Sequence, residues 1–150
     1  MSDATPPALP VTFRPARTRV VLLTLGVTIF VVVATVGLVL ENVGPGERAS
    51  FLSTAALFLG VLVLLARPKV VADDEGVTVV NITRTRRLAW AQILRVNLRH
   101  GDPWVFLDLS DGTSLPVLGI QPGIAKEKAI SDARALRALA ESHGSGSEAA

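Results

Sequence analysis

The sequence predicts an α+β membrane protein: a two-helix transmembrane hairpin followed by a small antiparallel β-barrel or bent sheet with a C-terminal amphipathic helix. Three observations support this fold class. Two uncharged apolar runs, 20–40 and 49–66, stand in the first half of the chain. Short β-branched runs separated by turn residues follow over 68–121. A stretch with helical periodicity then covers about 124–143.

The composition departs from that of an ordinary soluble domain. Hydrophobic residues make up 49% of the 150 residues, although aromatic residues contribute only 5%. The formal net charge of +2 does not indicate a polyanionic partner, and we expect no nucleic-acid partner. The absence of cysteine excludes disulfides, thiolate metal sites and a cysteine nucleophile.

The first apolar run, "VVLLTLGVTIFVVVATVGLVL", is long enough to cross a bilayer. At about 1.5 Å per residue it reaches roughly the ~30 Å thickness of the hydrocarbon core. A cleaved signal peptide is the competing interpretation, but its apolar core is only about 7–15 residues and precedes a small-residue cleavage site. The sequence "LVLENVG" at the end of the run offers no such site, so we expect a signal anchor.

The second apolar run, "ASFLSTAALFLGVLVLLA", is near the lower length limit for a span, and Arg67 and Lys69 can snorkel at its end. The connecting segment "ENVGPGER" is short, which predicts an antiparallel helical hairpin over 20–66. Small residues at Gly26, Ala34 and Gly37 favour a close approach of the two helices.

The distribution of basic residues predicts the orientation. Basic residues flank the outer ends of the two runs, whereas the connecting segment carries only Arg48: Arg14, Arg17 and Arg19 precede the first run, and Arg67, Lys69, Arg84, Arg86 and Arg87 follow the second. The positive-inside rule therefore predicts a multi-pass protein of the cell (plasma) membrane with both termini cytoplasmic. Residues 1–19, rich in proline, and 144–150 are expected to be disordered tails.

The segment after the second run has the pattern of six short strands. The stretch "VTVVNIT" is rich in β-branched residues, and "ILRVNLR" alternates so that Leu94, Val96 and Leu98 are expected on one face. Asp73-Asp74-Glu75-Gly76 and Asp111-Gly112 are turn signals. A C-terminal helix is predicted to end at Gly144 and to bury one face. That face comprises Ile130, Ala133, Leu136, Leu139 and Ala140, whereas Lys126, Lys128, Arg134 and Arg137 lie outside it.

Three stretches carry a resemblance to a known family. "DDEGVTVVN", then "RTRRLAWAQILRV", then "FLDLSDGTSLPV" are similar to bacterial PH-like domains, in which an acidic-Gly turn leads a strand and a Trp-x-x-Ile step precedes an Asp-Gly hairpin. With two spans in front, the chain resembles the actinobacterial membrane proteins grouped with low-molecular-weight protein antigen 6. The resemblance implies a PH-like interaction domain over 67–143. The acidic turn at 73–75 stands where phosphoinositide-binding PH domains carry a basic signature. We therefore do not expect this domain to bind phosphoinositides.

The sequence contains no pattern typical of an enzyme or a metal site. His100 and His143 have no carboxylate, serine or second histidine at a meaningful spacing. The acidic residues lack the spacing of a calcium loop, and no phosphate-binding glycine loop occurs. We therefore expect no catalysis, no cofactor and no metal, and hence no catalytic, cofactor-binding or metal-ligating residues.

The stretch "TRTRRLAWAQI" supplies the candidate contact residues. Arg84, Arg86 and Arg87 are expected either to form a solvated strand face or to contact anionic lipid headgroups or a protein partner. Trp90 is expected to be a structural anchor between sheet and helix. The favoured function is a membrane-anchored interaction module at the inner leaflet, binding a protein partner or a lipid headgroup. The alternative is a structural or accessory subunit of a larger membrane complex.

Overall fold

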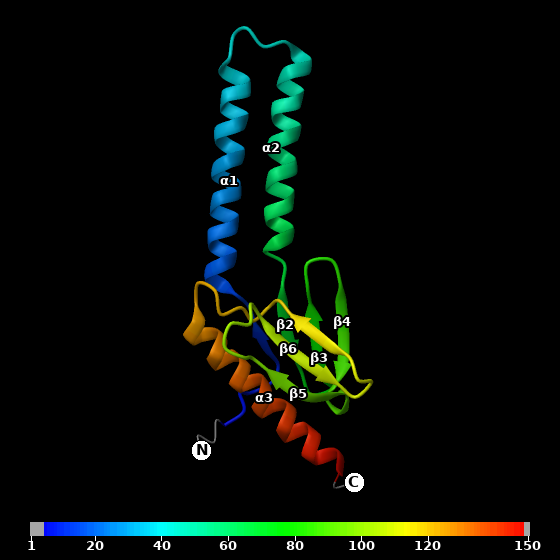
Figure 1. Cartoon of the computed structure of the whole chain (residues 1–150). Coiled ribbons are helices and arrows are strands. Elements are labelled where there is room, and N and C mark those ends of the chain that lie inside the picture. The colour runs from blue at the N-terminus through cyan, green and yellow to red at the C-terminus, as the bar shows by residue number, and fades with distance from the viewer. Residues whose placement is uncertain (1–4, 149–150) are drawn as a thin grey trace. The chain divides into compact units, whose positions relative to one another are not determined.

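The computed structural model describes residues 5–148 and divides them into two compact units. One unit is the helical hairpin, from Ala16 to Arg67. The other joins the residues before Ala16 to those from Pro68 onward. The second unit is therefore discontinuous in sequence, and the hairpin is inserted into it. Figure 1 follows the chain through both units by colour.

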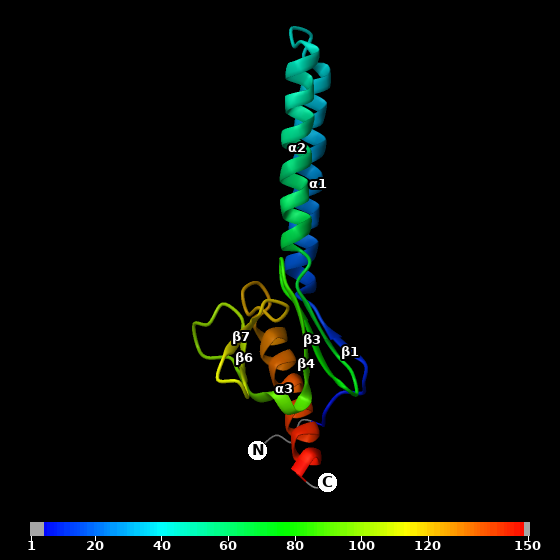
Figure 2. The same cartoon turned by 90° about the vertical axis from the view of Figure 1, so that its right-hand side faces the viewer.

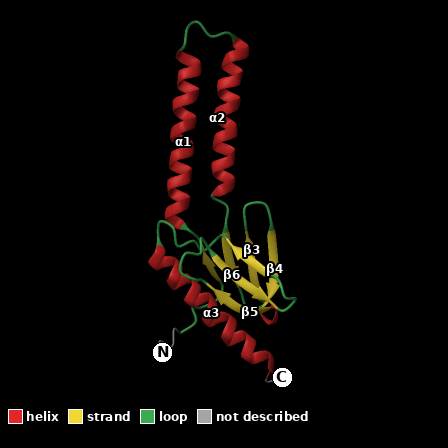
Figure 3. Ribbon diagram, in the orientation of Figure 1, coloured by secondary structure: helices red, strands yellow, loops and turns green. Residues whose placement is uncertain are grey.

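The hairpin consists of α1 (Ala16–Val39) and α2 (Pro45–Leu65), which pack side by side (Figure 3). Both helices are long and apolar enough to cross a membrane, and only 11% and 6% of their most apolar windows are buried. The core helix of a soluble protein would be mostly buried instead. The predicted pair of apolar helices is confirmed, and both begin earlier than expected. At the start of α2, the backbone N–H of Gly44 donates to the Glu47 side chain at 2.9 Å.

Small residues bring the two helices together. Gly26 and Gly37 are the buried residues of α1, and Ala55 is buried on α2. A Cβ atom at Gly37 would lie 2.7 Å from the Cβ of Phe51, closer than van der Waals contact permits. The predicted close approach at Gly26 and Gly37 is therefore confirmed.

The discontinuous unit contains two antiparallel sheets, and the first includes a strand from the N-terminal segment. Its order is β1 (Val11–Phe13), β2 (Lys69–Ala72), β3 (Gly76–Val80) and β4 (Thr85–Ala89). Phe13 pairs with Val70 across the first two strands and is only 4% exposed.

The expectation of a disordered tail over 1–19 is therefore wrong for 11–13, which form β1, and for 16–19, which begin α1. A strand of three residues has no detectable periodicity, and its pairing partner follows only after the whole hairpin. Residues 1–4 of that expected tail lie outside the described residues.

The second sheet has the order β5 (Ile93–Asn97), β6 (Val105–Leu109) and β7 (Ser114–Val117). A 3-10 turn, η1 (Trp90–Gln92), connects the two sheets. Figure 2 shows the helix α3 (Lys126–Glu148) beside both sheets. The described chain thus has seven strands where six were predicted, and the added strand is β1.

One core joins both sheets to α3. Val70, Val79, Leu107 and Val117 are buried in it, and the predicted helix face contributes Ala133, Leu136, Leu139 and Ala140. The prediction for Leu94 is wrong: it is 65% exposed, because an irregularity between Ile93 and Arg95 shifts the register and turns it outward.

The predicted helix stop at Gly144 is also wrong, since α3 continues to Glu148. Glycine ends a helix readily when it adopts a positive φ, and among the described glycines only Gly101 and Gly112 do so. In the interior of a helix glycine costs about 1 kcal/mol relative to alanine, which a helix anchored by upstream packing tolerates. Residues 149–150 of the expected tail lie outside the described residues.

Candidate functional site

The arginines of β4 do not share one face. Arg86 lies on the same side of the strand as the buried Leu88, whereas Arg87 lies opposite Thr78 on the outer side. Arg84 precedes the strand, in the turn between β3 and β4. The structure therefore places the three candidate residues in three different environments.

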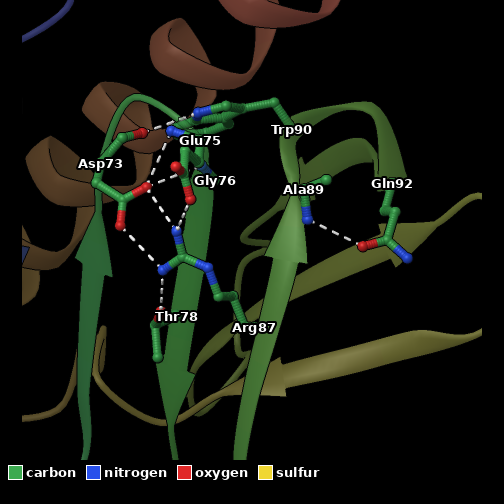
Figure 4. A network of polar contacts seen from close by, with 8 residues as sticks. All are labelled: Asp73, Glu75, Gly76, Thr78, Arg87, Ala89, Trp90 and Gln92. Carbon is green, nitrogen blue, oxygen red and sulfur yellow. Dashed lines mark hydrogen bonds and ion pairs between the residues drawn. The ribbon is translucent and has the colours of Figure 1, made fainter.

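Arg87 is bound into an ionic cluster with the β2–β3 turn (Figure 4). Its Nη1 lies 3.0 Å from Asp73 Oδ2, and its Nη2 lies 2.9 Å from Glu75 Oε2. A further hydrogen bond runs from Nη1 to the hydroxyl of Thr78 at 3.1 Å. The hydrogen bond from Arg87 lowers the pKa of the Asp73 carboxyl below its ordinary value, and the bond to Asp73 raises the pKa of the guanidinium. The charge of Arg87 is thus largely matched within the domain.

Arg86 reaches toward the second sheet. Its Nη2 lies 3.4 Å from Asp111 Oδ2, in the turn between β6 and β7, and both side chains are about half exposed. The pKa of Asp111 is lowered mainly by the hydroxyl and backbone N–H of Thr113. An exposed pair of this length contributes little stability, at most about 1 kcal/mol. It nevertheless gives Arg86 a local counter-charge.

Arg84 has no ion pair among residues 5–148. Its carbonyl accepts a hydrogen bond from the backbone N–H of Asn81 at 2.8 Å, which closes the turn. The Asn81 side chain in turn joins the two sheets, because it donates to the carbonyl of Pro116 at 2.8 Å and accepts from the N–H of Leu118 at 3.1 Å. The turn that carries Arg84 is therefore fixed, and its cation is solvent-exposed.

Trp90 lies in the core at 5% exposure. Its indole N–H donates to the carbonyl of Asp73 at 3.0 Å, and its ring stacks on the imidazole of His143, with 4.7 Å between ring centroids. The ring thereby connects the β2–β3 turn, η1 and α3. Figure 4 shows the indole above the Arg87 cluster. Sequence reasoning left His143 without a role, since no local pattern indicates a stacking partner so distant in the chain.

The two ends of the first sheet differ in charge. We call the end where β1 stops and β2 starts the hairpin end, since Phe13 pairs with Val70 and Lys69 with Val80 there. The cations Arg14, Lys69 and Arg84 belong to this end, and no acidic residue occurs in 11–15, 68–70 or 80–85. The opposite end carries the acidic turn 73–75, because Ala72 pairs with Val77 there. Antiparallel pairing thus separates the acidic turn from Arg84.

A comparison with known families finds a match within the discontinuous unit. Residues 67–139 match the bacterial PH domain family. The recognition of a bacterial PH-like domain from the sequence is confirmed, and so is the predicted fold of apolar helices, antiparallel sheets and a C-terminal helix. PH-like domains are generally non-catalytic interaction modules. The matched residues begin after the helical hairpin, so the match does not include β1 of this PH-like domain.

Curated relatives of this chain come from mycobacteria. An uncharacterized protein of Mycobacterium bovis and one of Mycobacterium tuberculosis are each 30% identical to it over 80 residues. The alignment covers 53% of this chain and 51% of each relative, so the chain spans about half the length of the curated relatives it matches. No solved structure matches the chain.

The described residues contain no cluster of potential metal ligands. Among residues 5–148, no group of three or more histidine, cysteine, aspartate or glutamate side chains is arranged to hold a metal ion. The described residues do offer groups of cations that can bind anions, at the hairpin end and beside α3.

Proposed function

We propose that this protein is a membrane-anchored interaction module of the inner leaflet, whose PH-like domain contacts anionic lipid headgroups through its hairpin end. The observation that carries the proposal is the separation of charge along the first sheet. Arg14, Lys69 and Arg84 stand at the hairpin end, whereas the acidic turn 73–75 stands at the other.

Chain connectivity supports the contact. Residues 14 and 15 join β1 to α1, and residues 66–68 join α2 to β2. A residue spans at most about 3.6 Å, so the hairpin end cannot move far from the ends of the two apolar helices. Its cations are thereby kept within reach of headgroups, where each basic residue contributes about 1 kcal/mol.

The pairing of β1 with β2 supports a topology in which both flanks of the helical hairpin lie on the same side of the membrane. A strand preceding α1 and a strand following α2 can pair only on the same side of the membrane. The basic flanks favour the cytoplasmic side for both.

The absence of cysteine makes this topology directly testable. Single substitutions Asn42→Cys, Thr12→Cys and Thr83→Cys, all at exposed positions, give unique labelling sites. In intact cells a membrane-impermeant maleimide should label N42C only. T12C and T83C should react only after the membrane is permeabilised. Labelling of T83C in intact cells would place the PH-like domain outside and overturn the cytoplasmic assignment.

The headgroup contact is tested with the full chain in lipid nanodiscs. An environment-sensitive dye on T83C should report a less polar surrounding in phosphatidylglycerol discs than in phosphatidylcholine discs. Rising salt should reduce the difference, because the Debye length falls to about 8 Å at physiological ionic strength.

The variant Arg14→Gln/Lys69→Gln/Arg84→Gln should remove the effect. Three cations together contribute about 3 kcal/mol, which corresponds to a change of roughly 150-fold in the ratio of headgroup-bound to unbound domain. Arg95→Gln is a single-charge control, because Arg95 is an exposed arginine of β5 away from the hairpin end. A dye signal that is equal in the two lipids, or undiminished in the triple variant, would contradict the proposal.

A further inference from the structure

An open cavity of about 700 Å³ lies within the PH-like domain, between the β5–β6 loop and the first half of α3. The loop contributes Leu98 through Pro103, and the helix contributes residues spaced along one side, from Lys126 to Arg137. Neither Arg84 of the hairpin end nor the acidic turn 73–75 lines this cavity.

The lining is strongly basic. Arg99 comes from the loop, and Lys126, Arg134 and Arg137 come from the helix, against one carboxylate, Asp102. That carboxylate accepts a hydrogen bond from the backbone N–H of Arg99 at 2.9 Å, so it holds the loop closed. Four cations therefore face one anion across a concave surface.

None of the cations of the cavity forms an ion pair within the described part of the chain. Arg99, Lys126 and Arg134 form no ion pair among residues 5–148. Arg137 is fixed by donating from Nε and Nη2 to the carbonyl of Val96 at 3.2 and 2.8 Å, which leaves its net charge at the cavity. Like charges gathered in a cleft raise the local potential and favour an anion.

None of the described acidic side chains of α3 lines the cavity. Lys128 forms its ion pair with Asp132, one turn further along the helix. Glu127, Asp132 and Glu141 do not line the cavity. The charged residues that α3 contributes to the cavity lining are therefore all cations.

The cavity also offers apolar contact. Leu98 and Ile130 line it and are partly buried, so a small carbon skeleton finds a surface there. Guanidinium groups bind phosphate oxygens through paired, charge-assisted hydrogen bonds. A phosphate monoester carries about −1.5 to −2 charges at pH 7. It therefore matches several cations better than a ligand with a single carboxylate would.

We propose that this cavity binds a phosphate monoester, with Arg99 and Arg134 as its main contacts and Lys126 as a further cation. The same group occurs on soluble molecules such as glycerol 3-phosphate and on the lipid phosphatidic acid. The site is separate from the hairpin end and does not depend on the headgroup contact proposed there.

The test uses the full chain in phosphatidylcholine nanodiscs and follows amide hydrogen exchange in 98–103 and 126–137. One arm adds glycerol 3-phosphate, balanced by chloride at equal ionic strength. The other arm replaces part of the lipid with phosphatidic acid. In at least one arm, exchange in these two segments should slow several-fold, and the arm identifies the source of the phosphate.

The substitutions Arg99→Gln/Arg134→Gln should abolish that protection, and each single substitution should weaken it. The control Arg95→Gln/Lys128→Gln removes the same amount of charge outside the cavity and should leave the protection from exchange unchanged. The triple variant of the hairpin end should retain it as well, which distinguishes the two sites. Unchanged exchange in both arms, or equal protection in the Arg99→Gln/Arg134→Gln variant, would overturn the proposal.

Discussion

Replacing Trp90 with alanine should destabilise the PH-like domain by about 3–5 kcal/mol. The ring is 5% exposed, stacks on His143 and donates its N–H to the carbonyl of Asp73. Removing it leaves a cavity at the junction of both sheets and α3 and takes away the partner of a carbonyl. A loss of this size is comparable with the whole stability of many small domains. Urea-dependent proteolysis of the full chain in nanodiscs measures it.

A pair of conservative substitutions isolates the hydrogen bond. Trp90→Phe keeps most of the ring but removes the donor to Asp73, so it should cost about 1 kcal/mol beyond the loss of ring area. Trp104→Phe is the matched control, because the Trp104 N–H is buried without a hydrogen-bond partner among the described residues. If Trp90→Ala unfolds at the same urea concentration as the unchanged protein, the ring is exposed in solution and becomes a candidate binding residue.

Replacing Phe13 with alanine should also cost about 3–5 kcal/mol, although this residue precedes the helical hairpin in the chain. Its side chain is 4% exposed in the core of the PH-like domain, and its strand covers the edge of β2. Thr12→Ala is the matched control, since Thr12 lies on the same strand and points to solvent. The same proteolysis assay, read on the PH-like domain, should separate the two variants clearly.

An independent measurement tests the strand pairing itself. Thr12 and Val71 are paired across β1 and β2, so cysteines at both positions should form a disulfide in this otherwise cysteine-free chain. Cysteines at Thr12 and Asn97, which lie in different sheets, should not. Equal stability of the Phe13→Ala and Thr12→Ala variants, together with failure of the first cross-link, would show that the N-terminal segment does not join the sheet.

The parts of the fold that could be predicted from the sequence are those with a strong local signal. The apolar helices follow from uninterrupted hydrophobicity, and the strands around the Asp73 and Asp111 turns follow from turn chemistry and alternation. Leu94 was misplaced because a register irregularity is invisible to a period of two. Gly144 was misread because its helical backbone depends on packing further up α3. Strand β1 was missed because its partner follows the entire hairpin.

The candidate site was predictable in its residue types but not in its arrangement. Alternation along β4 separates Arg86 from Arg87, yet only the antiparallel register shows that Asp73 meets Arg87 and that Arg84 stands at the other end. The basic cavity beside α3 left no motif, because Arg99 and Arg134 come from a loop and a helix far apart in the sequence. The pattern of charges within each segment does not indicate that Arg99 and Arg134 lie near each other in the fold.

The placement of β1 ahead of the hairpin has a consequence for biosynthesis. A ribosome that adds roughly 5–20 residues per second completes β2 several seconds after β1 has emerged. During that interval Phe13 has no partner. In the proposed membrane topology it gains one only if the second helix returns the chain to the side of the membrane where β1 lies. A nascent chain whose second helix fails to insert would leave β2 with an unpaired edge, the kind of exposed edge that invites aggregation and degradation. In the proposed topology, folding of the first sheet therefore depends on correct insertion of both helices.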